Sequence, residues 1–461
     1  MSVLVVILAL AFLMWAAYRG HSVILFSPIA ALFAVLLTSP ELVAPMFSGV
    51  FMVKMVDFIK LYFPVFMLGA IFGKVIEISG FSKSIVASVV RLIGTERAIF
   101  AIVLVCSLLT YGGVSLFVVV FAVYPFAAEL FRAGNIPKRL IPGTIALGAF
   151  TFTMDALPGT PQIQNIIPST FFQTNTWSAP ILGVSGSLFI LLCGLWYLNL
   201  CRKNAQLKGE GYGQNLQNEP EHFNDERQVN FLIALLPLVV VGVANLIFTK
   251  VIPQYYGKEY IIHLTGMPVT VDITKLTAIW SVQAALILGI LTVFIFAAKP
   301  VIHHFATASK SAISGALLAS LNTASEYGFG AVIAAMPGFM VVTDALKHIP
   351  NPLINEAITV SVLAGITGSA SGGMSIALAA MSGHFIEAAN AAGISLDVLH
   401  RIASMASGGM DTLPHNGAVI TLLAVTGLTH KEAYKNIFVI TIIKTLAVFF
   451  AIAVFYATGW Y

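Results

Sequence analysis

Two aspartates occupy matching positions far apart in the chain, each within a long apolar stretch. Asp155 begins the sequence Asp-Ala-Leu-Pro, and Asp411 begins the sequence Asp-Thr-Leu-Pro. Ionisable side chains are costly in an apolar medium, so such residues are candidates for function. Each aspartate could bind a coupling ion, carry a proton, or cap the half-helix that follows it.

Glu326 and His415 are further candidates, and neither has a counterpart elsewhere in the chain. Glu326 ends the sequence Asn-Thr-Ala-Ser-Glu, and the equivalent earlier place is near Leu68. This asymmetry favours a role in substrate or proton binding over a scaffold role. His415 titrates near neutral pH, so it suits a proton carrier or a donor to a carboxylate. A purely structural histidine is the alternative.

Glycine pairs mark a second set of matching positions. Residues 112–116 read Gly-Gly-Val-Ser-Leu, and residues 372–376 read Gly-Gly-Met-Ser-Ile. The shift is 372 − 112 = 260 for the glycines and 411 − 155 = 256 for the aspartates. A weaker match, Gly-Phe at 80 and at 338, has a shift of 338 − 80 = 258. Three matches in the same order indicate an internal duplication.

The medium around these elements follows from composition. Hydrophobic residues make up 58% of the 461 positions and charged residues only 10%, and the mean hydropathy is +0.92. A soluble domain has about 25% charged residues, so the solvent is a lipid bilayer. The basic residues are dispersed, which excludes a nucleic-acid surface. The three cysteines lack metal-ligand spacing, and we expect no metal and no cofactor.

Loop charges predict the path of the chain, because Lys and Arg collect on the cytoplasmic side. The linker at residues 201–229 and the stretch 131–140 contain several Lys and Arg and are placed inside, whereas residues 170–180 are uncharged and are placed outside. The acidic residues of the linker count little in this rule. The apolar stretch at residues 98–131 must then begin and end inside, so it is predicted to be a re-entrant hairpin with its tip at the glycines. The moderately apolar segment at residues 42–55 could be an interfacial helix or part of a span.

The predicted fold is an all-α polytopic membrane protein of two inverted repeats. It has about ten spanning helices, two re-entrant helical hairpins and two interrupted helices, with both termini outside. The first repeat (1–200) holds a hairpin at 98–131 and a broken helix at 140–170. The second repeat (230–461) holds a hairpin at 357–391, entering from outside, and a broken helix at 398–428. Inverted repeats with broken helices are typical of secondary transporters, whose sites lie at the breaks.

The breaks are where the chain can bind a polar ligand. A half-helix N-terminus offers free N–H donors and partial positive charge, which suit a carboxylate. The alternative is ordinary packing of small residues between helices. The predicted substrate-binding residues are Gly112, Gly113, Ser115, Thr160, Asn322, Thr323, Ser325, Ser371, Gly372, Gly373, Ser375, His415 and Asn416. The predicted proton- or ion-coupling residues are Asp155, Glu326, Asp411 and His415.

At these residues the chain resembles a known family. Residues 404–427, which include Gly-Gly-Met-Asp-Thr-Leu-Pro-His-Asn-Gly, resemble the gluconate permease family and its hydroxybutyrate permease branch most closely. The two glycine tips resemble the same group. The resemblance implies membership of the ion transporter superfamily, proton symport of small hydroxy-monocarboxylates, a homodimer, and an elevator-like transport domain on a scaffold. The first repeat departs from the pattern, with Gly-Thr-Pro at 159–161 against His-Asn-Gly at 415–417.

The sequence therefore predicts a proton-coupled symporter for a small organic anion such as 3-hydroxybutyrate or gluconate, in a bacterial inner (plasma) membrane. A sodium-coupled symporter is the close alternative, because carbonyls and hydroxyls at the breaks also suit Na⁺. An anion channel is a weaker alternative. No HExxH, Ser–His or P-loop pattern is present, so we expect neither an enzyme nor an ATP-driven pump.

Overall fold

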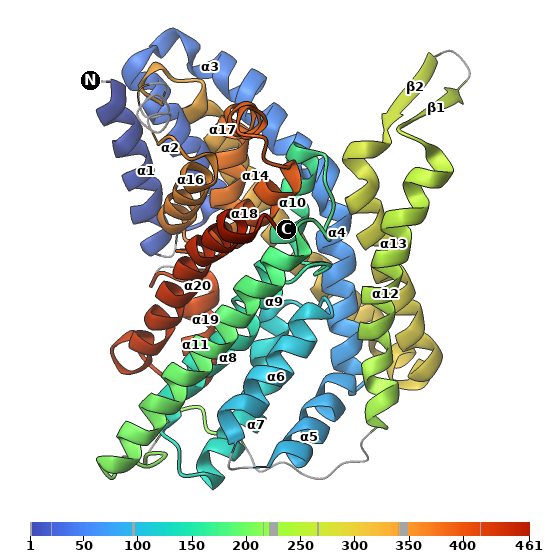
Figure 1. Ribbon diagram of the computed structural model, residues 1–461, viewed down its shortest axis with the longest axis vertical. Coiled ribbons are helices and arrows are strands. Elements are labelled where there is room, and N and C mark those ends of the chain that lie inside the picture. Colours follow the sequence, from blue (N-terminus) through green and yellow to red (C-terminus); the bar gives the residue numbers. More distant parts are fainter. Residues whose placement is uncertain are drawn as a thin grey trace.

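The computed structural model describes residues 2–19, 21–94, 97–214, 216–220, 229–264, 267–339, 341, 349–414 and 416–461. Nearly all of this chain is helical (Figure 1). Five helical runs are long and apolar enough to cross a membrane, judged by length and composition among the described residues. They are Pro40–Ile78, Pro180–Leu207, Phe231–Tyr256, Ile273–Phe296 and His430–Thr458. The all-helical polytopic fold class is confirmed.

The helices before the linker are α1 (Ser2–Tyr18), α2 (Val23–Thr38), α3 (Val43–Met46), α4 (Met52–Ile78), α5 (Phe81–Ile93), α6 (Ala98–Tyr111), α7 (Leu116–Ala133), α8 (Ile141–Ala149), α9 (Phe152–Asp155), α10 (Ile163–Phe172) and α11 (Pro180–Leu207). The segment at residues 42–55, which could be an interfacial helix, is helical and continues into α4. A short helical turn at Pro40–Leu42 leads into α3, and a second turn at Phe47–Phe51 joins α3 to α4, so that these residues form one continuous helical run.

The helices after the linker are α12 (Phe231–Tyr256), α13 (Ile273–Phe296), α14 (Ala298–Ala334), α16 (Pro352–Thr367), α17 (Ala370–Ala391), α18 (Leu396–Ser407), α19 (Gly417–Thr426) and α20 (His430–Thr458). A β-hairpin of β1 (Glu259–Leu264) and β2 (Met267–Asp272) joins α12 to α13. Its strands are antiparallel and pair Glu259 with Asp272. The sequence reading had missed it.

Each predicted hairpin is a pair of packed helices. α6 and α7 are joined at Gly112 and Gly113, and α16 and α17 are joined at Gly368 and Ser369. Gly113 and Gly368 both have positive φ, +97° and +65°, which a glycine adopts without a steric penalty. Each predicted interrupted helix is also broken, between α9 and α10 in one case and between α18 and α19 in the other.

The two hairpins have their bases at opposite ends of the molecule. At the base of α7, Arg132 and Lys138 pair with Glu219 of the linker. Asp397, just beyond the end of α17, instead lines a surface cavity of about 360 Å³ with Asn175, Trp177 and Lys250, at the far end of α11. A helix of the 28 residues in α11 spans about 42 Å, so the bases are separated by roughly a membrane thickness.

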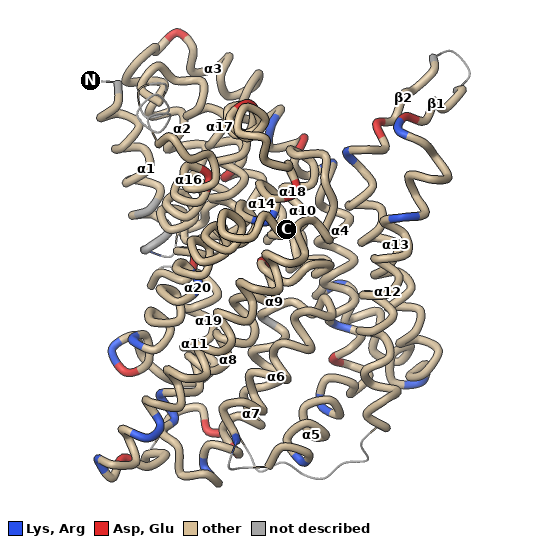
Figure 2. Tube along the Cα trace, in the orientation of Figure 1, with Lys and Arg blue, Asp and Glu red and all other residues tan. Residues whose placement is uncertain are grey.

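Charged side chains gather mainly at the linker end. Figure 2 shows Lys and Arg around α5, the lower ends of α7 and α11, and the linker. Glu210 receives hydrogen bonds from Arg139 of 2.6 and 2.7 Å, and these bonds lower the pKa of that carboxyl. Burial alone would raise the pKa of Glu219, but its hydrogen bonds from Lys138 and Arg132 outweigh burial and lower it.

Candidate functional site

The second hairpin tip and the second helix break are joined by one side chain, Asn416. Its Oδ1 accepts hydrogen bonds from the backbone N–H groups of Ala418 (2.6 Å) and Val419 (3.0 Å), which caps the N-terminus of α19. Its Nδ2 donates to the carbonyl of Gly368 (2.7 Å), where α16 ends. One amide therefore satisfies polar groups on both elements and fixes the tip against the break.

Glu326 lies against the same tip from the side of α14. The Glu326 side chain is 3% exposed, and its Oε2 has no hydrogen-bond partner among the described residues. A Cβ at Gly372 would collide with this carboxylate, so the glycine makes room for it at the first turn of α17. One turn earlier on α14, Thr323 Oγ1 lies 3.2 Å from Ser371 Oγ. The face of α14 that carries Thr323 and Glu326 is thus the wall of the second tip.

The N-terminus of α17 holds this carboxylate under two opposing influences. Ser369 caps the helix by accepting a hydrogen bond from the N–H of Gly372 (3.1 Å), and the partial positive charge of the helix end favours an anion. Burial without a cationic partner among the described residues disfavours the ionised form. Opposing effects of this kind suit a group that must change its charge during a reaction cycle.

The first hairpin tip has a different environment. Gly112 packs directly on Leu238, and Gly113 lies near Pro161, Leu286 and Phe72. Polar contacts at this tip come from the break beside it: Gln162 Nε2 donates to the carbonyl of Thr110 (2.8 Å). The first tip is therefore enclosed mainly by apolar side chains, and the second tip is the polar one.

Asp155 lies where the two broken helices meet. Its side chain is 3% exposed, and a Cβ at Gly408 would collide with its Oδ2. Ser404 Oγ donates to the backbone carbonyl of Asp155 (2.6 Å). The second broken helix thus supplies both the space and a hydrogen bond for the break in the first.

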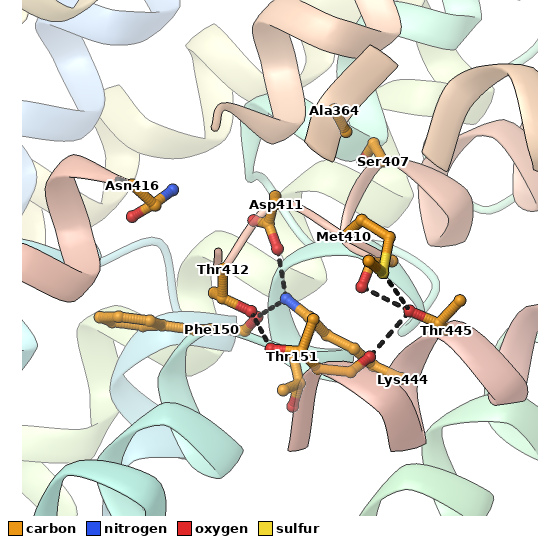
Figure 3. Close-up of polar contacts among 12 residues, drawn as sticks. Phe150, Thr151, Ala364, Ser407, Met410, Asp411, Thr412, Asn416, Lys444 and Thr445 are labelled. Carbon is orange, nitrogen blue, oxygen red and sulfur yellow. Dashed lines mark hydrogen bonds and ion pairs between the residues drawn. The ribbon is translucent and has the colours of Figure 1, made fainter. Parts of the chain in front are cut away.

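Asp411 forms a buried ion pair with Lys444 of α20 (Figure 3). The Lys444 side chain is 2% exposed, and its Nζ also donates to the carbonyl of Phe150 at 3.2 Å, where α8 ends. Beside the pair, Thr412 Oγ1 lies 2.7 Å from Thr441 Oγ1. One ammonium group therefore neutralises the carboxylate of the second break and satisfies a free carbonyl of the first broken helix.

Arg401 closes the first break from the other side. Its guanidinium is fully buried and donates to the carbonyls of Ala156 (3.1 Å), Thr176 (3.1 Å) and Ser178 (2.7 and 3.0 Å). It also donates to Asn165 Oδ1 (2.9 Å). These acceptors are neutral and all precede the linker, so Arg401 stabilises unwound backbone rather than pairing with a carboxylate.

The structure corrects one predicted role of the aspartates. Neither Asp155 nor Asp411 caps the half-helix that follows it, because the residues at those positions are Gln162 and Asn416. Asp155 instead ends α9, and Asp411 follows α18 in the turn that faces Lys444. Both remain at the breaks, where ion or proton coupling stays a prediction.

The other predicted residues divide into those at the second tip and those engaged elsewhere. Thr323, Ser371, Gly372, Glu326 and Asn416 come together there. Thr160 donates to the carbonyl of Thr153, Ser325 faces Met55, and Gly373 packs on the backbone of Ala364. Ser375 is buried without a partner for its hydroxyl, and Ser115 precedes α7 without a side-chain cap. Asn322 is half-buried on α14, and His415 lies outside the described residues.

Four buried Lys, Arg, His or Glu residues were missed by the sequence reading: Lys444, Arg401, His400 and Glu356. Lys444 lies in an apolar stretch that had been read as an ordinary span, Arg401 and His400 lie in the predicted broken helix at 398–428, and Glu356 directly precedes the predicted hairpin at 357–391. The signal was available, since any ionisable residue inside a spanning segment is a functional candidate. What the sequence did not show was the partner, because Lys444 pairs with a residue 33 positions away.

No protein-family model matches the chain. It is 55% identical to the uncharacterized transporter YxjC of Bacillus subtilis (strain 168), over 470 aligned positions that cover all of both chains. The chain belongs to the family of that transporter. The broken helices and buried charges described above therefore lie in the interior of a membrane transporter.

Two solved structures share the fold at low sequence identity. The YdaH transporter of Alcanivorax borkumensis, described as having an unusual topology, aligns with a TM-score of 0.60 and 14% identity, covering 88% of each chain. MtrF of Neisseria gonorrhoeae, described within a class of antimetabolite efflux pumps, aligns with a TM-score of 0.54 and 13% identity, covering 90% of this chain and 84% of MtrF. These similarities show the architecture of a polytopic transporter and leave substrate and coupling to the site itself.

Proposed function

We propose that this transporter is a proton-coupled symporter of a small hydroxy-monocarboxylate, with 3-hydroxybutyrate and gluconate as the first candidates. The observation that carries the proposal is the burial of the Glu326 carboxyl at the polar tip of the second hairpin, where it has no cationic partner among the described residues. The resemblance of residues 404–427 to gluconate permeases supports the substrate class.

The proposed substrate site lies between the N-termini of α17 and α19. Asn416 holds the tip and the break together, so the two helix ends lie at one place. Their partial positive charges favour a carboxylate, and the hydroxyls of Thr323 and Ser371 offer hydrogen bonds to a hydroxyl on the ligand. The buried cations Lys444 and Arg401 are engaged by other groups, which leaves the helix ends to bind the anion.

Coupling follows from electrostatic repulsion in this site. With Glu326 ionised, a substrate carboxylate at the same helix end would face a like charge. Protonation of Glu326 removes that repulsion, so proton and anion each increase the affinity for the other. Net movement of the pair carries no charge through the bilayer, and this lowers the cost of crossing.

The elevator movement and the homodimer are parts of the same proposal. Hairpins based at opposite ends of the molecule offer an opening to each side, as alternating access requires. The basic linker end would face the cytoplasm of a bacterial plasma membrane, and both chain termini would lie outside. Cysteine accessibility from each side of the membrane would test the orientation, and cross-linking in the bilayer would test the dimer.

Uptake into proteoliposomes tests the function directly. An inward proton gradient, in sodium-free buffer, should drive accumulation of labelled 3-hydroxybutyrate or gluconate, and a protonophore should abolish it. Accumulation that needs a sodium gradient instead would establish the sodium alternative and refute proton coupling. Ohmic current without accumulation would indicate a channel. Gradient-driven transport in the export direction alone would indicate efflux, the activity of the class in which MtrF is described.

A further inference from the structure

A second buried carboxyl, that of Glu356, lies in the second hairpin and takes no part in the site described above. It is on α16, in the second turn after the N-cap Asn351. The Glu356 side chain is completely inaccessible. Neither of its carboxyl oxygens has a hydrogen-bond partner among the described residues.

Among the described residues, the helices around Glu356 offer it no counter-charge. α16 packs against α1, α17, α18 and α20. Arg401 and His400 of α18 bind Asn165, and Lys444 of α20 binds Asp411. The remaining acids, bases and histidines of these helices are His384, Glu387, Asp397, His430, Lys431, Glu432 and Lys435. Among the residues whose side chains are described, none hydrogen-bonds to Glu356 or forms an ion pair with it.

A packing role does not explain a glutamate at this position. An ionised carboxyl here would be buried without compensation. Even the neutral acid leaves a donor and an acceptor unpaired, which is unfavourable in a buried site. An apolar side chain of similar size would avoid both costs. Acidic residues that persist at such expense in membrane segments characteristically serve proton or substrate pathways.

The position of Glu356 along the hairpin supplies the second argument. Glu356 precedes Gly368 at the tip by 368 − 356 = 12 residues, or about 18 Å of helix. It follows the N-cap Asn351 by 356 − 351 = 5 residues, or about 7 Å. Glu326 is therefore at the tip of the hairpin, and Glu356 is near its base, toward the aqueous end.

We propose that Glu356 is a second proton-binding site of this transporter, which exchanges its proton with the aqueous phase at the base of the second hairpin. Glu326 couples substrate binding at the tip to the binding of one proton, whereas Glu356 binds a different proton and does not contact the substrate. Each transport cycle then moves two protons, one bound to Glu326 and one bound to Glu356.

Infrared difference spectroscopy tests this binding site without any substrate. Purified protein in lipid is shifted between acidic and basic pH, and the carbonyl band of protonated carboxylic acids is recorded. In the wild type, the band of one protonated carboxylic acid should disappear as the pH rises. This change should be absent from the difference spectrum of Glu356→Gln and present in that of Glu387→Gln, an exposed control on α17. Identical spectra for the wild type and Glu356→Gln would overturn the proposal. Should the glutamine variant not fold, Glu356→Met serves the same comparison.

The role in transport is measured separately and rests on the proposed function. In proteoliposomes held at zero membrane potential, the pH gradient that just balances an imposed substrate gradient gives the number of protons per anion. We expect Glu356→Gln or Glu356→Met to lower this number by one while transport of 3-hydroxybutyrate continues. An unchanged number would overturn the second proton. If the wild type shows no proton-driven transport of any tested anion, the proposed function fails while the infrared result still decides the proton site.

Discussion

Replacing Glu326 with glutamine should separate substrate binding from the proton. Glutamine keeps the size of the side chain but is permanently neutral, as the protonated glutamate is. In the wild type, affinity for the anion should fall as pH rises and Glu326 loses its proton. In Glu326→Gln, affinity should stay near its high, acidic-pH value at every pH.

The size of the effect follows from the geometry of the tip. The Glu326 carboxylate lies against Gly372 in the first turn of α17, so an anion bound at that helix end would be about 5 Å away. Two like charges at this separation repel by about 3 kcal/mol at an effective dielectric constant of about 20. That free energy corresponds to a roughly 200-fold weaker affinity for the anion when Glu326 is ionised.

The assay is binding of 3-hydroxybutyrate to purified protein, measured by thermal shift or calorimetry on either side of neutral pH. Exchange of labelled for unlabelled substrate should persist in Glu326→Gln, whereas accumulation driven by a pH gradient should be lost. Glu387→Gln, on the exposed face of α17, should behave as wild type in both assays. A pH dependence of binding in Glu326→Gln equal to that of the wild type would refute the reasoning.

Three further predictions concern stability. Lys444→Met leaves Asp411 buried without its partner and should lower the unfolding free energy by about 3–5 kcal/mol, with much of the loss recovered when Asp411 is also changed to asparagine. Gly408→Ala places a methyl group on the Asp155 carboxylate and should cost about 1–3 kcal/mol, seen as a lower melting temperature. Glu210→Gln should reduce stability by up to about 1 kcal/mol near neutral pH. Because the folded-state pKa of Glu210 is lowered, its contribution is present above its ordinary pKa and lost as pH falls through the folded value, so the two melting curves should converge in acid.

Matched controls are available for each of these variants. Lys431 is exposed on α20, so Lys431→Met should leave the melting temperature unchanged. A Cβ at Gly383 would meet nothing within 4 Å, so Gly383→Ala should be neutral or slightly stabilising. A Lys444→Met protein as stable as the wild type would contradict the ion pair, and a constant difference between Glu210→Gln and the wild type down to acid pH would contradict the assigned titration.

Much of the architecture could be predicted because its signals are local. Glycine pairs and the Leu-Pro sequences after the aspartates interrupt apolar stretches, and these are the features that end helices. Their recurrence at nearly one shift located both hairpins and both breaks. The β-hairpin at Glu259–Asp272 was not predicted, because two strands of six residues give a weak periodic signal between long apolar helices.

The pairing within the site could not be predicted, because it depends on how helices pack. Symmetry in the sequence treats Asp155 and Asp411 as equivalent, yet one lies over Gly408 and the other pairs with Lys444. The same symmetry treats the two tips alike, although Leu238 closes the first and Glu326 the second. These differences arise from side chains on neighbouring helices that the repeat does not duplicate.

The buried Arg401 has a consequence for the order in which the protein assembles. Its guanidinium satisfies carbonyls of Ala156, Thr176 and Ser178, which leave the ribosome more than 200 residues earlier, as 401 − 178 = 223 shows. During synthesis the first break therefore stands open, with its polar backbone dependent on water or on the insertion machinery. Arrival of α18 closes it. The polar backbone at the first break therefore gains its hydrogen bonds only when the second half supplies Arg401.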